Sequence, residues 1–248
     1  MSDQDLVFGL HAVQAFLQKS PERALEMFVL REREDQKLQA LLTLATRSGV
    51  RPQSVPRRWF EDRLADVVHQ GVALRIRALP PQSDNELLAR LEKLDEPPFL
   101  LILDGVTDPH NLGACLRSAD AAGVHGLIVP RDKSAPLNAT ARKVACGAAE
   151  TVPVYQVTNL ARTLRAIQEA GVWVVGTAGE ATETLYQARL TGPLALAMGA
   201  EGSGLRRLTR EHCDLLVNIP MAGSVSSLNV SVATGICLFE ALRQRQAH

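Results

Sequence analysis

Apolar residues are concentrated in short runs from residue 99 onward, and each run is followed by a segment long enough for a helix. Such runs are typical of strands that are buried on both faces of a parallel sheet, with helices covering the two faces. We therefore expect an α/β fold in which a ligand binds beyond the carboxyl ends of the strands. The expected strands are 99–103, 127–130, 152–157, 172–176, 194–198 and 215–220.

The first 79 residues show shorter, mixed patterns that predict a separate small α/β unit. Residues 80–98, which follow, are acidic and flanked by prolines, with one short helix expected at 86–94, and this composition is typical of a linker. The sequence thus predicts three parts, 1–79, 80–98 and 99–248. Within the first part, helices are expected at 11–18, 35–46 and 57–65, and strands at 26–30, 50–55 and 72–76.

Composition limits the possible functions without choosing one. The hydrophobic content of 46% and charged content of 22% are those of an ordinary soluble globular protein. Because 27 basic residues balance 27 acidic ones, no long-range field attracts a polyanion, and nucleic-acid binding would depend on local clusters. The four cysteines are widely spaced, so we expect no disulfide framework and no metal. The acidic N-terminus does not resemble a signal peptide, and no apolar run approaches the ~18 residues that a membrane span needs. We therefore expect a cytoplasmic protein.

Three of the expected strands end in polar or glycine-rich loops, at 104–111, 199–204 and 218–231. Because the carboxyl ends of parallel strands share one edge of a sheet, these loops are expected to meet at one site. The glycines at 199, 202 and 204 do not fit the dinucleotide spacing, and Glu201 would lie where a pyrophosphate binds. The middle loop therefore suits a ligand that is uncharged or cationic near Glu201, although glycines after a strand also serve simply to make a tight turn.

The three loops together resemble the motifs of a known family. Residues 103–117, 199–204 and 219–229 are similar to the motifs of the SpoU (TrmH) family, in the SPOUT superfamily of S-adenosylmethionine-dependent RNA 2'-O-ribose methyltransferases. Residues 5–79 resemble that family's ribosomal-protein-like domain, which binds the RNA substrate. The resemblance is closest to bacterial members that methylate a guanosine ribose in the peptidyl-transferase P loop of 23S rRNA during ribosome maturation. Members that act on tRNA carry the same motifs, so the spacing alone leaves a tRNA substrate open.

The resemblance implies features that periodicity does not. Family members fold residues equivalent to 193–240 into a deep trefoil knot, bind S-adenosylmethionine there, and form homodimers through the closing helix, here 227–246. Backbone groups around residues 199, 219 and 228 would contact the adenosine part of the methyl donor. The residues expected to bind the donor are Met198, Gly199, Gly202, Ile219, Met221, Ser227 and Leu228.

The chemistry of the reaction also points to particular residues. A ribose 2'-hydroxyl is a poor nucleophile until it begins to lose its proton, so the protein must polarise it. Arg117 is the candidate, either as the general base that family proposals describe or as a guanidinium that grips the adjacent phosphate and stabilises the developing alkoxide. The residues expected to orient Arg117, the ribose or the donor are Asn111, Glu201, Ser227 and Asn229.

Each of these residues also has a purely structural interpretation. Asn111 is a candidate N-cap of the helix that follows it, Ser226 or Ser227 a candidate cap of the closing helix, and Arg117 has Asp120 one turn away. Two other classes of function stay open, a non-catalytic RNA-binding module and a nucleotide-using oxidoreductase. The complete set of motif residues favours the methyltransferase over both.

Short clusters of basic residues are either contacts to RNA phosphates or ordinary solvated surface. We favour RNA contact for the group at 131–143, because it follows the carboxyl end of an expected strand. The clusters are Arg57–Arg58, Arg131–Lys133, Arg142–Lys143 and Arg206–Arg207 with Arg210.

Overall fold

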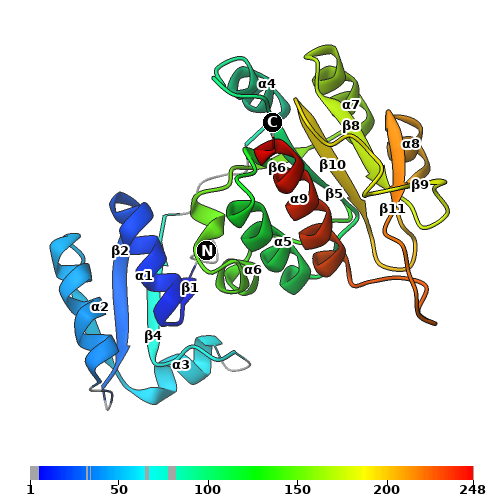
Figure 1. The fold of residues 1–248 in the computed structure, drawn as a ribbon. Coiled ribbons are helices and arrows are strands. Elements are labelled where there is room, and N and C mark those ends of the chain that lie inside the picture. The colour runs from blue at the N-terminus through cyan, green and yellow to red at the C-terminus, as the bar shows by residue number, and fades with distance from the viewer. Residues whose placement is uncertain (1–5, 32, 34, 65–66, 78–81, 248) are drawn as a thin grey trace.

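A computed structural model describes residues 6–31, 33, 35–64, 67–77 and 82–247, which form two sheets with their helices (Figure 1). The N-terminal unit, residues 6–77, contains a four-stranded sheet of order β1-β4-β2-β3. β4 pairs antiparallel with β1 and β2, and β2 pairs parallel with β3. The elements are β1 (Leu6–Phe8), α1 (Leu10–Lys19), the 3-10 helix η1 (Pro21–Arg23), β2 (Ala24–Leu30), α2 (Gln36–Arg47), β3 (Pro52–Val55), α3 (Arg57–Leu64) and β4 (Val72–Ile76).

Strand alternation gives this small sheet a core on each face. Met27 and Val29 of β2 join the apolar cluster formed with α1 and α2, whereas Phe28 between them joins the cluster formed with α3. The helices and strands expected from periodicity are present, although residue 65, the last one of the third expected helix, lies outside the described residues. β1 is an additional strand, and with three residues it is too short to show an alternating pattern.

The segment between the two units packs against the second sheet. Its helix α4 (Asp84–Leu91) begins with a capping box in which Ser83 and Glu86 satisfy each other, and these bonds to Ser83 hold the pKa of Glu86 below its usual range. Leu87 is fully buried, and Gln82 exchanges backbone hydrogen bonds with β7. The helix predicted at 86–94 thus starts and ends earlier than expected, and it belongs structurally to the C-terminal unit, residues 82–247.

The C-terminal unit contains a seven-stranded sheet of order β7-β6-β5-β10-β8-β11-β9, in which every pairing is parallel. The expected α/β fold is confirmed, and β9 is an additional two-residue strand at the edge. The elements are β5 (Phe99–Asp104), α5 (Pro109–Ala121), β6 (Gly126–Pro130), α6 (Ala139–Ala145), the 3-10 helix η2 (Ala148–Glu150), β7 (Val154–Val157), α7 (Leu160–Glu169), β8 (Trp173–Thr177), β9 (Glu183–Thr184), β10 (Leu194–Gly199), α8 (Arg207–Glu211), β11 (Leu215–Asn218) and α9 (Val230–Gln246).

Helices cover both faces of this sheet, as Figure 1 shows. All six residues of β5 are buried, and they alternate between two cores. Phe99, Leu101 and Leu103 face the cluster shared with α5, α6 and α9, while Leu100 and Ile102 face the cluster shared with α4 and α7. This explains why the strand reads as a continuous apolar run.

β10 lies in the middle of the sheet although it comes late in the chain, between β5 and β8. The chain therefore returns from the edge strand β9 to the centre and then runs outward again to β11. The trefoil knot expected from the family resemblance stays a prediction. Across the ranges that the structure describes, no helix has the length and apolar character needed to cross a membrane.

Candidate active site

Three strand ends meet at the carboxyl edge of the large sheet, as the sequence predicts. β5 and β10 are neighbours and end in register, with Gly199 opposite Asp104. The loop after β11 returns to the same place, because side chains at the start of α9 bond to residues of α5 and of the loop after β10. One site therefore contains residues that are about a hundred positions apart in the chain.

The loop after β10 is a tight hairpin that requires glycine. Ala200 and Gly204 exchange two backbone hydrogen bonds of 3.1 and 2.9 Å, and Gly202 and Gly204 have φ values of 78° and 66°. A methyl group added at Gly199 would lie 2.1 Å from the carbonyl carbon of Gly204. The tight turn considered in the sequence interpretation is thus present, and it also lines a cavity described below.

Asp104, at the end of β5, bonds to Arg206, which follows this hairpin, and so holds the hairpin against the sheet. Its carboxylate is fully buried and accepts hydrogen bonds from the Arg206 backbone N–H at 2.9 Å and from the Arg206 guanidinium Nε at 2.5 Å. Arg206 is one of the candidate RNA contacts, and its guanidinium already pairs with the buried carboxylate of Asp104, although the Arg206 side chain is 45% exposed. The role of Asp104 was missed because its partner lies 102 positions away.

Asn111, Glu201 and Asn229 form a polar cluster where the three loops join. Asn229 Nδ2 donates to Asn111 Oδ1 at 3.0 Å and to Glu201 Oε1, and Asn111 Nδ2 donates to Glu201 Oε1 at 3.2 Å. The Val230 backbone N–H also approaches Glu201 Oε1, at 3.3 Å. One carboxylate oxygen of Glu201 therefore accepts hydrogen bonds from three donors, one on α5 and two at the start of α9. These bonds fix the loop after β10 to both helices.

The helix caps separate the structural interpretations from the functional ones. The N-cap of α5 is Asp108, which accepts from the His110 N–H at 2.9 Å, so Asn111 lies inside the helix and is not its cap. The N-cap of α9 is Asn229, which accepts from the Ser231 N–H at 2.9 Å, so neither Ser226 nor Ser227 has that role. Asn229 is therefore both a helix cap and a member of the polar cluster.

Arg117 is exposed on α5, three residues before Asp120. Its guanidinium Nη1 lies 3.6 Å from Cys146 Sγ, and Asp120 instead accepts a hydrogen bond from Thr151. Within the described ranges, no hydrogen bond joins Arg117 to Ser227 or to the polar cluster. The guanidinium thus retains donors for an anionic group of an incoming ligand.

A cavity of about 480 Å³ opens beside the polar cluster. Its wall contains all seven residues predicted to bind the methyl donor, namely Met198, Gly199, Gly202, Ile219, Met221, Ser227 and Leu228, and also Glu201. Arg117, Asn111 and Asn229 are not part of the wall. The cavity and the exposed arginine are therefore distinct parts of the site.

The sequence interpretation missed one wall of this cavity, formed by Thr177, Ala178, Gly179 and Glu180 after β8. Glu180 pairs with Arg210, and a hydrogen bond from its own backbone, followed by the one from Arg210, holds the pKa of Glu180 below its usual range. β8 lies between β10 and β11, so its carboxyl end must reach the site. The sequence patterns did not predict this strand order, so they did not predict this wall.

Among the residues that the structure describes, no group of three or more His, Cys, Asp or Glu side chains is placed to hold a metal ion. Burial raises the pKa of Cys115 to about 11 and the pKa values of Cys213 and Cys237 to about 12, whereas Cys146 is exposed. The thiols of Cys115 and Cys237, which are buried, and of Cys213, which is half-buried, are therefore neutral packing groups.

The basic residues at 131–143, which the sequence analysis favours for RNA contact, have different surroundings in the structure. Arg131 and Lys133 are exposed beyond the end of β6 and stay predicted RNA contacts. Arg142 is buried and pairs with Glu150 at 2.5 Å, so the prediction is wrong for this residue. Lys143 lies over the ring of Phe8 in the N-terminal unit, 5.2 Å from its centroid.

Comparison with known proteins extends these observations. Residues 98–239 match the model of the SpoU rRNA Methylase family, and residues 6–82 match a model described as RNA 2'-O ribose methyltransferase substrate binding. Proteins named 23S rRNA (guanosine-2'-O-)-methyltransferase RlmB from Pectobacterium atrosepticum and Escherichia coli K12 are each 62% identical to this chain over 241 residues. These alignments cover 97% of this chain and 98% and 99% of the two relatives.

Solved structures show the same likeness over both units. The SpoU methyltransferase AviRb from Streptomyces viridochromogenes, in complex with AdoMet, has a TM-score of 0.81 at 26% identity and covers 98% of this chain and 90% of its own. An AdoMet-bound rRNA methyltransferase from Sinorhizobium meliloti has a TM-score of 0.75 at 26% identity, covering 96% and 87%. The A. aeolicus TrmH/SpoU tRNA modifying enzyme has a TM-score of 0.56 at 32% identity and covers 66% of this chain and 85% of its own.

Proposed function

The chain belongs to the SpoU rRNA Methylase family, and we propose that it transfers a methyl group from S-adenosylmethionine to the 2'-hydroxyl of a guanosine in 23S rRNA. The observation that carries this proposal is the 62% identity, over almost the whole length of both chains, to 23S rRNA guanosine methyltransferases. We place the target guanosine in the peptidyl-transferase P loop, as the family resemblance implies, and the action in the cytoplasm during ribosome maturation.

The cavity beside Glu201 fits the proposed methyl donor. Ile219, Leu228 and Met198 give it apolar surface for an adenine ring, and the glycine hairpin allows close approach to backbone groups. Glu201 lines the cavity and would supply a carboxylate for the cationic part of the donor, which is the preference inferred from the loop sequence. When bound, S-adenosylmethionine supplies a methyl group that is already activated by its sulfonium.

We assign the activation of the ribose hydroxyl to Arg117. Its exposed guanidinium suits the bidentate grip of an RNA phosphate, which would fix the ribose and stabilise negative charge that develops on the 2'-oxygen. Arginine is effectively never deprotonated in proteins, so we favour this role over that of a general base. Asn111, Glu201 and Asn229 would hold the three loops in register, and Ser227 would contact the donor or the ribose.

The proposal includes a division of labour between the two units. The N-terminal unit, in the region 1–79, would bind the RNA, and the part from 99 to 248 would carry the reaction. Residues 80–98 would connect the two, with α4 packed against the second sheet. This division is supported by the separate sheets and by the family model for substrate binding at residues 6–82. The knot around residues 193–240 is also part of the proposal.

We further propose that the protein is a homodimer in which α9 of one copy packs beside the site of the other. One side of α9, including Cys237 and Leu238, is buried in the core. Val232 and Phe239 are 52% and 49% exposed on the outside, and Met221 and Val225 in the preceding loop are 37% and 61% exposed. Such an apolar surface is typical of a protein interface.

Mapping of 2'-O-methyl groups in a strain without this protein tests the function. We expect one guanosine of 23S rRNA to lose its methyl group and the tRNA pattern to stay unchanged. The family also contains tRNA-modifying members, one of which is similar to 66% of this chain. Loss of a tRNA methyl group alone would refute the rRNA substrate and leave the reaction class intact.

A further inference from the structure

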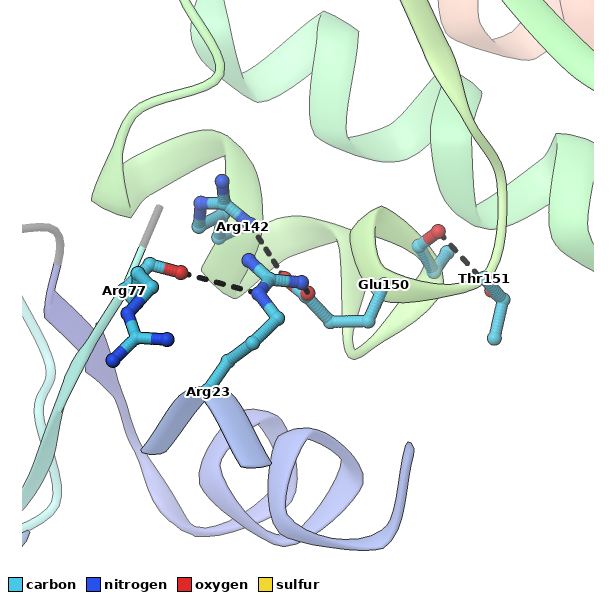
Figure 2. A network of polar contacts seen from close by, with 6 residues as sticks. Arg23, Arg77, Arg142, Glu150 and Thr151 are labelled. Carbon is cyan, nitrogen blue, oxygen red and sulfur yellow. Dashed lines mark hydrogen bonds and ion pairs between the residues drawn. The ribbon is translucent and has the colours of Figure 1, made fainter. Parts of the chain in front are cut away.

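Beyond the site itself, a buried ion cluster joins the two units (Figure 2). Arg23 of η1, in the N-terminal unit, donates through Nη1 to Glu150 Oε2 at 2.6 Å, and Arg142 of α6 donates through Nη1 to Glu150 Oε1 at 2.5 Å. The side chains of Arg23, Arg142 and Glu150 are only 11%, 6% and 3% exposed. One carboxylate therefore neutralises part of the charge of two guanidiniums that belong to different units.

Arg23 is held in place on its own side of this interface. Its Nε donates to the Arg77 carbonyl at 3.1 Å, and its guanidinium lies 5.2 Å from the centroid of the Phe16 ring. Arg77 follows β4, the last strand before the chain leaves the N-terminal unit, and Figure 2 shows its carbonyl pointing at Arg23. The ion pair thus connects a fixed point of the N-terminal unit, and not a mobile surface side chain, to Glu150.

The surface on which the N-terminal unit docks is the segment that supports Arg117. A methyl group added at Gly147 would lie 2.4 Å from Ala15 Cβ of α1, so α1 touches the turn after α6 directly. The preceding residue, Cys146, is the one whose thiol lies beside the Arg117 guanidinium. The position of α1 on this turn is therefore transmitted to the proposed catalytic arginine through two neighbouring residues.

A second contact connects the same segment to α5. Thr151, next to Glu150, donates its hydroxyl to the Asp120 carboxylate, and Asp120 lies on α5 three residues after Arg117. α6 and η2 also pack along α5. Glu150 is thus bonded to the N-terminal unit on one side, and its neighbour is bonded to the helix of Arg117 on the other.

We propose that Glu150 is a positioning residue for methyl transfer, because its carboxylate clamps the RNA-binding unit, through Arg23, onto the turn that supports Arg117. This inference rests on the proposed function. Without the carboxylate, the buried Arg23 guanidinium would lose its ion-pair partner across the interface, and the cost of this uncompensated charge would weaken the docking of the N-terminal unit on α6. RNA held by that unit would then reach Arg117 in a variable position, whereas the cavity for the methyl donor would be untouched.

Kinetics of Glu150→Gln test the effect on catalysis. With transcribed 23S rRNA, we expect kcat/KM to fall by at least about tenfold, since a misplacement of about 1 Å can cost about a hundredfold. The Kd for S-adenosylmethionine should stay within about twofold of the wild-type value, because the altered cluster does not line the cavity. Glu26→Gln is the matched control, since Glu26 pairs with Arg75 inside the N-terminal unit and should leave both constants unchanged.

The distance between the units tests the clamp directly. Spin labels on cysteines placed at exposed Gln39 of α2 and Glu169 of α7, with Cys146→Ser in all samples, report that distance by pulsed electron resonance. Labelled protein is diluted with unlabelled protein so that only one chain of a dimer carries labels. We expect a narrow distribution in the wild type and broad distributions in Glu150→Gln and in Arg23→Gln, each of which removes the ion pair across the interface.

Three results would overturn the inference. They are a distribution for Glu150→Gln as narrow as that of the wild type, a loss of donor affinity equal to the loss in kcat/KM, and an unchanged distribution and kcat/KM in Arg23→Gln. If Glu150→Gln does not fold, Arg23→Gln removes the same ion pair from the other side of the interface. The distances are measured without RNA or methyl donor, so a wild-type protein that fails to methylate rRNA refutes the proposed function separately from the clamp.

Discussion

Asn229 has two roles that substitutions can separate. Its Oδ1 caps α9, while its Nδ2 bonds to Asn111 and Glu201. Asn229→Ser keeps a good N-cap residue but removes the amide donor, whereas Asn229→Ala removes both. We expect Asn229→Ala to lower the free energy of unfolding by about 1 kcal/mol and Asn229→Ser to change it by only a few tenths. Both variants should lose about tenfold or more in kcat, because without the amide donor this side chain no longer ties the start of α9 to α5 and to the loop after β10, and a misplacement of about 1 Å can cost about a hundredfold in rate.

Thermal unfolding and single-turnover methylation of the two Asn229 variants make this comparison. A serine variant with full activity would show that the amide contacts are dispensable and that Asn229 is only a cap.

The role of Arg117 can be decided by the pH dependence of Arg117→Lys. If the guanidinium grips a phosphate, lysine keeps the charge but loses the bidentate geometry, so RNA binding should weaken while the pH–rate profile keeps its shape. We expect this result. A general base would behave differently, because lysine has the lower pKa, and the apparent ionisation would move to lower pH with part of the activity retained. Rates measured over a range of pH, with RNA affinity measured in parallel, discriminate between the two.

His69 gives the N-terminal unit a pH-dependent stability. Burial, followed by the charges of Arg57 and Lys143, lowers the pKa of His69 from 6.5, and its ring stacks on Phe60 with 4.4 Å between centroids. The unfolded chain therefore binds a proton near pH 6.5 that the folded chain does not yet bind. Stability is then complete above this pH and falls as the pH decreases below it.

Replacement of His69 by glutamine, which does not titrate, should reduce this dependence. We expect the melting temperature of the wild type to decrease more than that of His69→Gln between about pH 7.5 and about pH 5.5. Equal decreases in the two proteins would show that other groups cause the acid sensitivity.

At the scale of the elements, α9 supports the clearest prediction about assembly. Val232 and Phe239 lie seven residues apart and so point to the same side, away from the buried Cys237 and Leu238. We expect Phe239→Glu to convert a dimer into a monomer, since it places a charge in an apolar contact. Light scattering after size-exclusion chromatography measures the mass. Leu25→Glu is the control, because Leu25 is 45% exposed in the N-terminal unit and lies outside the proposed interface.

Elements were predicted well where one pattern determines them. The continuous apolar runs of β5 and its neighbours follow directly from burial on two faces. Asp108 before Pro109 is a recognisable helix start, although Asn111 is the cap that the sequence analysis names. Short elements such as β1 and β9 contain too few residues to show a period. Buried partners such as Asp104 and Arg206, or Glu150 and Arg23, are more than a hundred positions apart, so no local pattern connects them.

At the scale of the whole molecule, the strand order decides what surrounds the site. Local patterns predicted that three loops would meet, and the polar cluster confirms this, but the position of β8 between β10 and β11 adds a fourth loop to the cavity. The order also places α5, α6 and α9 together on one face, where the N-terminal unit docks on α6. Site residues that belong to a motif were therefore predictable, whereas those that depend on topology were not.

The balanced charge of the whole molecule leads to a last prediction, about RNA binding. With 27 basic and 27 acidic residues, affinity must come from exposed cations near the site, and Arg23, Arg142 and Arg206 are already bound to carboxylates within the protein. Arg131, beyond the end of β6, has a side chain that is 62% exposed, and its ion pair with Asp132 is long, at 3.9 Å. We expect Arg131→Ala to reduce the slope of log K against log salt by about 0.7–0.9, the contribution of one phosphate contact.

Arg90→Ala is the control for this prediction. Arg90 is also exposed, on the last turn of α4, and its replacement should leave the slope unchanged. Filter binding to a 23S rRNA transcript at several salt concentrations gives both slopes, and equal reductions in the two variants would mean that the RNA follows no defined path across the carboxyl edge of the sheet.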